Sequence, residues 1–101
     1  MQDGGRRVSA KYLTMIGRPN GRACDRLGII ASRRVGGAVV RNRAKRRLRE
    51  LFRRESPARA VEEGRRAMDV VIIARTALAV APFAEIATDF QEALRRLRGA
   101  R

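Results

Sequence analysis

The sequence has no histidine, and among its 101 residues it has one cysteine, one tyrosine and three phenylalanines. Without histidine, no side chain ordinarily exchanges a proton near neutral pH, and the ten acidic residues are scattered. The single cysteine, Cys24, excludes an intrachain disulfide and a cysteine cluster for zinc. These absences favour a binding protein without catalytic residues or a metal site of its own.

Long apolar segments are absent too. No stretch approaches the ~20 apolar residues of a membrane-spanning helix. The first eight residues are polar and glycine-rich and offer no apolar stretch for a secretory signal, so a cytoplasmic location is expected. The length and a hydrophobic content of 45% suit one modest core, and we therefore expect a single domain over residues 1–101.

Charge of one sign dominates the chain. There are 24 Lys and Arg residues against 10 Asp and Glu, a formal net charge of +14. Such self-repulsion disfavours a compact state unless a polyanion neutralises it. Nucleic acid is the polyanion that compact basic domains most often bind, so we expect nucleic-acid binding that weakens strongly with salt.

Residues 40–54 concentrate this charge. Eight of these fifteen residues are Lys or Arg, and only Glu50 is acidic. An apolar row at helical spacing runs through them, formed by Val40, Ala44, Leu48, Leu51 and Phe52. The row predicts a helix over about 38–54 that packs on a core and presents guanidinium groups to an anion. A merely solvated face is disfavoured, because like charges at helical spacing repel one another.

Because a helix rotates by about 100° per residue, the cationic residues of this helix, together with Asn42, fall into two groups. The first group, here the Asn42 side, consists of Arg41, Asn42, Lys45, Arg46, Arg49 and Arg53. The other group, here the second flank, consists of Arg43, Arg47 and Arg54. Arg33 and Arg34 precede the helix in a loop with two glycines. The aromatic residues that stack on unpaired bases in many RNA-binding modules are scarce, and charge alone does not distinguish RNA from DNA.

The other segments predict three strands, over 8–16, 27–32 and 68–75, and a second helix over about 82–98. Alternation in the first strand places Tyr12 and Thr14 on the same face. The apolar run 70–74 is typical of an interior strand covered on both faces. Residues 58–63 predict a short helical turn. The order of elements predicts an α/β (α+β) two-layer sandwich, with helices packed on a small mixed sheet.

The segment from Arg41 to Arg49 resembles the arginine–asparagine–arginine signature helix of the bacterial ribonuclease P protein component. Residues 27–40 resemble the strand and glycine loop that precede this helix, and residues 69–75 resemble the later central strand. The resemblance covers about residues 5–97. It implies a sandwich with a left-handed crossover, and a protein subunit that pairs with a catalytic RNA to remove the 5′ leader of precursor tRNA, the RNA performing the hydrolysis with Mg²⁺.

The resemblance also implies roles for particular residues. The RNA-contacting residues would be Arg33, Arg34, Arg41, Asn42, Arg43, Lys45, Arg46 and Arg49. The candidate leader-cleft residues would be Tyr12, Thr14 and Ser32. Family members usually begin with a helix that carries aromatic residues, placed before the glycine matched to Gly5. We expect that N-terminal helix to be missing here and the cleft to be incomplete.

Two alternatives remain at this point. One is a non-enzymatic RNA-binding structural protein, such as a small ribosomal protein. The other is a DNA-compacting protein, which is weaker because neither a helix-turn-helix nor a minor-groove arm is recognisable. An asparagine inside an arginine-rich helix, preceded by a strand and a Gly-Gly loop, favours the ribonuclease P subunit.

Overall fold

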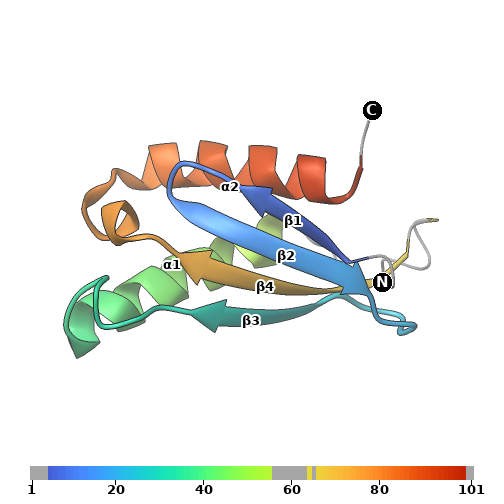
Figure 1. Ribbon diagram of the computed structural model, residues 1–101, viewed down its shortest axis with the longest axis horizontal. Coiled ribbons are helices and arrows are strands. Elements are labelled where there is room, and N and C mark those ends of the chain that lie inside the picture. Colours follow the sequence, from blue (N-terminus) through green and yellow to red (C-terminus); the bar gives the residue numbers. More distant parts are fainter. Residues whose placement is uncertain (1–4, 56–63, 65, 100–101) are drawn as a thin grey trace.

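The computed structural model describes residues 5–55, 64 and 66–99 (Figure 1). The predicted turn at 58–63 lies outside these residues. In chain order the elements are the strands β1 (Arg6–Ser9), β2 (Leu13–Pro19) and β3 (Arg26–Ile30), the helix α1 (Ala38–Glu55), the strand β4 (Met68–Ala74), the 3-10 helix η1 (Thr76–Val80) and the helix α2 (Phe83–Leu97). Among these residues, no helix is both long enough and apolar enough to cross a membrane.

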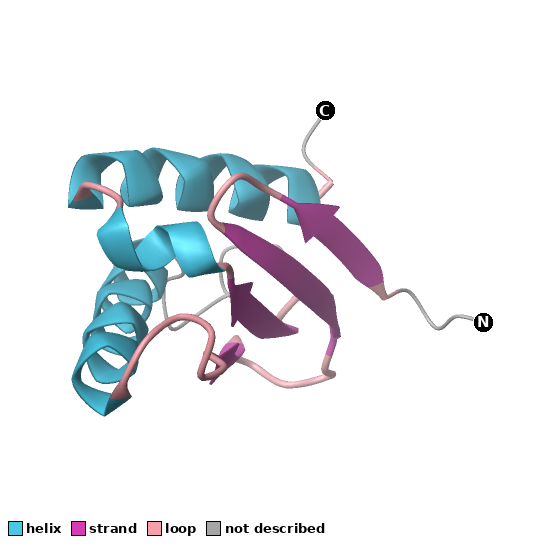
Figure 2. Ribbon diagram, turned by 60° about the vertical axis from the view of Figure 1, so that its left-hand side comes forward, coloured by secondary structure: helices cyan, strands magenta, loops and turns pink. Residues whose placement is uncertain are grey.

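The four strands form one mixed sheet in the order β1-β2-β4-β3. β2 pairs antiparallel with β1 and β4, whereas β3 pairs parallel with β4. Both helices pack on the same face of the sheet, which is the far face in Figure 1 and lies toward the left in Figure 2. The β3-α1-β4 connection is therefore left-handed, against the strong general preference for right-handed crossovers. The predicted two-layer α+β fold and its left-handed crossover are confirmed.

The predicted single strand over 8–16 is wrong. The chain reverses at residues 10–12, and its two halves pair as a hairpin with Ser9 opposite Thr14. The turn carries no glycine or proline, so the alternation of residues 8–16 continues through it and the sequence gives no sign of the reversal. A distant carboxylate stabilises the reversal, because Asp89 of α2 accepts the backbone N–H groups of Lys11 at 3.1 Å and Tyr12 at 2.8 Å.

The prediction for the apolar strand at 70–74 is partly right. β4 lies between β2 and β3 in the interior of the sheet. Val70, Ile72 and Ala74 are buried, but the alternate residues Val71 and Ile73 are only half-buried. The run predicted a strand covered on both faces, but among the described residues both helices lie on the same face of the sheet.

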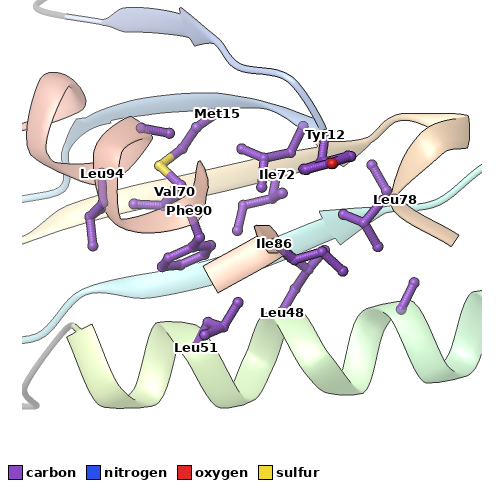
Figure 3. Packing of buried hydrophobic residues seen from close by; sticks show 14 of the residues in the cluster. Tyr12, Met15, Leu48, Leu51, Val70, Ile72, Leu78, Ile86, Phe90 and Leu94 are labelled. Carbon is purple, nitrogen blue, oxygen red and sulfur yellow. The ribbon is translucent and has the colours of Figure 1, made fainter. Parts of the chain in front are cut away.

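The core fills the space between the sheet and the helices (Figure 3). Its fully buried side chains include Met15 of β2, Leu48 and Leu51 of α1, and Ile86 and Phe90 of α2. The core therefore fixes the rotation of α1 about its own axis. That rotation decides which of the cationic residues of α1 face outward.

Candidate nucleic-acid interface

Helix α1 presents most of the predicted Asn42 side outward. Asn42, Arg46 and Arg49 are exposed, while Arg41 and Lys45 are half-buried at the margin of the core. In the predicted apolar row, Ala44, Leu48 and Leu51 are buried, whereas Val40 and Phe52 are half-buried. The row thus anchors a rigid helix whose outward surface is cationic and includes one amide.

Arg41 has an unusual environment on this side. Its Nε atom is buried and has no hydrogen-bond partner in the part of the chain that the structure describes. An N–H donor buried without an acceptor costs free energy, because it has lost its hydrogen bond to water. Arg41 is thus a guanidinium that the protein itself leaves incompletely satisfied.

The loop between β3 and α1 holds the predicted residues Ser32, Arg33 and Arg34. The backbone N–H of Val35 bonds to the Ser32 carbonyl at 3.0 Å, and the N–H of Arg34 bonds to Ser32 Oγ at 3.3 Å. Val35 is buried with 5% of its surface exposed, so it fixes the loop to the core. Arg33 and Arg34 are exposed on this turn, close in the chain to the first turn of α1.

The second flank of α1 lies against η1 and the start of α2. Arg43 donates to the carbonyl oxygen of Ala79 in η1 at 3.5 Å. The guanidinium carbons of Arg47 and Arg54 each lie 5.9 Å from the centre of the Phe83 ring. Glu50 lies between the two groups of arginines and accepts from Arg53 at 2.8 Å and Arg54 at 3.2 Å. Among the predicted RNA-contacting residues of α1, Arg43 thus lies on the second flank, against η1.

The three candidate leader-cleft residues do not share one surface. Tyr12 is buried among core residues (Figure 3). Its hydroxyl donates to Glu85 of α2 at 2.6 Å. That bond to Glu85 is the main cause that raises the pKa of Tyr12 above its ordinary value of 10.0. Thr14 lies on the face opposite the helices, because its neighbours Leu13 and Met15 point into the core. Ser32 lies in the loop beyond β3.

The face of the sheet opposite the helices forms a surface that sequence reasoning missed. Strand register aligns Ile16 of β2 with Val71 of β4, and Thr14 with Ile73, which is opposite Ile30 of β3. Four arginines lie around these apolar residues, with Arg75 donating to Thr14 Oγ1 at 3.1 Å. The four are Arg7, Arg18, Arg26 and Arg75. Three of them lie on β1, β2 and β3 and Arg75 directly follows β4, so only the correct alternation and strand order would have revealed the group.

One edge of that face carries an ionic network. Arg26 of β3 forms two hydrogen bonds to Asp69 of β4, at 2.7 and 2.8 Å, and the Asn20 amide donates to the same carboxylate at 3.0 Å. These bonds, above all the one from Arg26, hold the pKa of Asp69 well below its ordinary value. The network joins the ends of three strands.

A family model described as Ribonuclease P matches residues 1–98 of the chain. The chain belongs to the ribonuclease P protein family. It is the protein subunit of ribonuclease P, a ribonucleoprotein endonuclease of tRNA processing, and the resemblance noted in the sequence is confirmed.

Curated relatives agree with this assignment. The chain is 33% identical over 96 residues to the ribonuclease P protein component of Citrifermentans bemidjiense, an alignment that covers 95% of the chain and 78% of the relative. It is 43% identical over 72 residues to the protein component of Kocuria rhizophila, covering 71% of the chain and 59% of that relative.

Solved structures show the same fold. The Staphylococcus aureus RNase P protein, in a mutant described as having defective mRNA degradation activity, superposes with a TM-score of 0.77 at 28% identity, covering 91% of this chain and 74% of that one. The Thermotoga maritima RNase P protein, in complex with 1-(4-fluorophenyl)-2-thiourea, gives a TM-score of 0.72 at 29% identity, covering 96% and 87%. The ribonuclease P fold is thus shared over nearly the whole chain.

Proposed function

We propose that this ribonuclease P protein acts as one domain over residues 1–101 and binds the catalytic RNA of the enzyme through α1 and the loop before it. The observation that carries the proposal is the rigid, outward-facing Asn42 side on a helix whose other side is locked into the core. The residues proposed to contact RNA are Arg33, Arg34, Arg41, Asn42, Arg43, Lys45, Arg46 and Arg49.

The chemistry of this surface suits a folded RNA. Planar guanidinium groups donate two parallel hydrogen bonds to a phosphate, whereas an ammonium acts as a point charge. The Asn42 amide both donates and accepts, so it can contact a base edge or a ribose hydroxyl among phosphate-binding arginines. Because the core fixes the helix, little conformational freedom is lost when RNA docks.

Arg41 strengthens the proposal. Its buried Nε has no acceptor among the described residues. A phosphate oxygen that drew the guanidinium outward would supply the missing hydrogen bond, and the free energy lost by burial would be recovered on binding. The same reasoning does not extend to Arg53, which already pairs with Glu50.

We place the 5′ leader of precursor tRNA on the open face of the sheet, around Thr14, which is only 5% exposed and accepts a hydrogen bond from Arg75. The apolar residues Ile16, Val71 and Ile73 offer a floor for bases, and the surrounding arginines offer partners for the phosphates. Ser32 stands near the end of β3 that borders this face. Tyr12 acts here only indirectly, since it lies in the core and supports the β1–β2 turn.

The chemical step belongs to the RNA in this proposal. The resemblance implies that the RNA performs the hydrolysis, and among the described residues no three His, Cys, Asp or Glu side chains lie together as they would around a metal ion. We therefore assign Mg²⁺ and hydrolysis of the phosphodiester to the RNA subunit. The protein positions RNA and leader, in the cytoplasm, where precursor tRNA is processed in a bacterial cell.

Reconstitution of the enzyme tests the proposal. The full chain is added to its cognate catalytic RNA and a precursor tRNA at low Mg²⁺ concentration, and leader removal is followed by gel electrophoresis. Because the protein offsets repulsion between two polyanions, we expect it to stimulate cleavage most when Mg²⁺ is scarce. Binding to the RNA without any stimulation would contradict the proposed role and would favour a purely structural RNA-binding protein.

A further inference from the structure

A second cationic surface lies on the opposite side of α1 from Lys45. It consists of three arginines, one aromatic residue and two valines, and we call it the Phe83 face. Its members are Val39, Arg43, Arg47, Arg54, Val80 and Phe83. Figure 2 shows η1 between α1 and α2 on this side of the molecule.

The apolar part of this face is unusually exposed. Val80 is 86% exposed and Val39 is 80% exposed, the highest fractions of any large apolar side chain in the described part of the chain. Both lie next to Arg43. Val39 precedes Arg43 by one helical turn of α1, and Val80 follows Ala79, whose carbonyl oxygen accepts from Arg43. Exposed apolar side chains on the two elements that Arg43 joins make this a mixed apolar and cationic surface, which suits a ligand that carries both kinds of group.

The arginines of this face are held in place, and some of their N–H donors remain available. Each guanidinium of Arg47 and Arg54 lies 5.9 Å from the centre of the Phe83 ring, within the range of a cation–π contact. Such a contact uses the flat face of the guanidinium and leaves the N–H groups along its edge available. In the described part of the chain, neither Arg43 nor Arg47 has a carboxylate partner, and Arg54 shares Glu50 with Arg53.

A nucleotide matches both properties of this face. Its phosphate is an anion for the edges of Arg43, Arg47 and Arg54, and its base is a flat apolar surface for the exposed valines Val39 and Val80. An acidic protein segment would satisfy the arginines alone and leave the valines in water. The charge and the exposed apolar area together therefore favour RNA.

We infer that the Phe83 face is a second RNA-binding surface, which binds an unpaired nucleotide and its flanking phosphates from the catalytic RNA that docks on the Asn42 side. The inference rests on the proposed function. The Asn42 side and the three arginines of the Phe83 face lie on one helix of 18 residues, about 27 Å long, with Glu50 between the two groups. An RNA that reaches the Asn42 side is therefore the polyanion nearest to the Phe83 face.

Salt-dependent binding to the isolated catalytic RNA tests the arginines. The double variant Arg47→Gln/Arg54→Gln removes two charges and leaves a shorter, neutral but polar amide at each position. We expect the slope of log K against log salt to become shallower by about two, because two phosphates are then no longer neutralised by the protein. The control Arg95→Gln/Arg96→Gln removes two exposed charges near the other end of α2 and should leave the slope unchanged. Circular dichroism establishes that both variants fold.

Cross-linking tests the apolar part independently. A photo-cross-linker is attached to Val80→Cys in a Cys24→Ser chain, with Thr88→Cys on the exposed surface of α2 as the control position. In the assembled complex with precursor tRNA, we expect position 80 to cross-link to the catalytic RNA and position 88 not to. Cross-links only to precursor tRNA, or none, would overturn the inference, as would an unchanged salt slope.

A parallel measurement on Arg46→Ala separates this inference from the proposed function. If Arg46→Ala weakens binding while the double variant does not, only the Phe83 face fails. If Arg46→Ala has no effect on binding either, the proposed RNA contact of the Asn42 side fails with it.

Discussion

The carboxylate of Asp89, in α2, accepts the backbone N–H of Tyr12 at 2.8 Å, across 77 positions of the chain. The same carboxylate accepts the N–H of Lys11 at 3.1 Å. A hairpin turn without glycine or proline is thus held by a side chain from the second helix. This bond orders β1 and β2, and through β2 it orders the face of the sheet that carries Thr14.

Removal of this carboxylate should destabilise the fold. Asp89→Ala leaves two backbone donors without their acceptor, and hydrogen bonds to a charged group each contribute about 1.5–3 kcal/mol. Because water partly reaches the turn and can bond to the two N–H groups, we expect the variant to lose only about 2 kcal/mol of unfolding free energy. Urea denaturation measures it. Thr88→Ala, on the exposed surface of the same helix, should change stability by less than about 0.5 kcal/mol, and an equal effect of the two variants would contradict the role of Asp89.

The ionisation of Tyr12 can be followed without interference, because it is the only tyrosine in the chain. Its hydroxyl donates to Glu85, which favours the neutral form and raises its pKa above 10.0. The associated stability is fully present below the unfolded pKa and is lost as pH rises through the folded pKa. We expect absorbance at 295 nm to titrate above pH 10 in the folded protein and at lower pH in Glu85→Gln. Identical titration curves would show that the hydrogen bond to Glu85 does not control Tyr12.

The ionic network at Asp69 should make the free energy of unfolding depend on pH. Arg26 and Asn20 lower the pKa of this carboxyl below 3.8, so its contribution is present above the unfolded pKa and is lost as pH falls through the folded pKa. Asp69→Asn should therefore be less stable than the original chain at pH 6, and the gap should narrow below about pH 4. Denaturation at a series of pH values measures the gap. A difference in unfolding free energy between the two proteins that stays constant from pH 6 to pH 2 would show that ionisation of Asp69 does not contribute to stability.

The glycine pair before α1 provides a matched comparison. Gly36 has a φ of +152°, and a Cβ there would lie 2.7 Å from Cγ1 of Val40. Gly37 has nothing within 4 Å of its Cβ position. We expect Gly36→Ala to cost about 1–3 kcal/mol of unfolding free energy and to weaken RNA binding, since the strain falls on the loop that carries Arg33 and Arg34. Gly37→Ala should be close to neutral in both measurements, and similar losses from the two variants would argue against a special backbone at Gly36.

Binding of the catalytic RNA to the Asn42 side should depend on salt concentration. Arg46 is exposed at the centre of the Asn42 side. Arg46→Ala should weaken binding to the catalytic RNA and make the slope of log K against log salt shallower by about one. Arg96→Ala, an exposed arginine on α2, serves as the charge-matched control. A slope that changes equally in both variants would mean that only net charge matters and that the Asn42 side has no specific contact.

The helix at 38–55 could be predicted closely from the sequence, because its apolar row and its charges have the same helical period and two glycines precede it. The second helix could be predicted for the same reason, with Pro82 before it and Gly99, at a φ of +73°, after it. The β1–β2 hairpin could not, since its turn has no local signal and is held by Asp89. The burial of Tyr12 could not be predicted either, because it depends on Glu85 and on the packing of α2.

The sequence by itself determined that this protein has a strongly basic helix with one amide among its arginines, and the family to which that motif belongs. Composition and period are local properties, which the chain carries before it folds. Only the tertiary structure decided that Arg47 and Arg54 meet Phe83 while Arg43 bonds to Ala79 of η1. It also decided that Thr14 shares a face of the sheet with arginines far apart in the chain. Those groupings depend on strand order and on the rotation of α1 against the core, which arise from contacts between residues far apart in the chain.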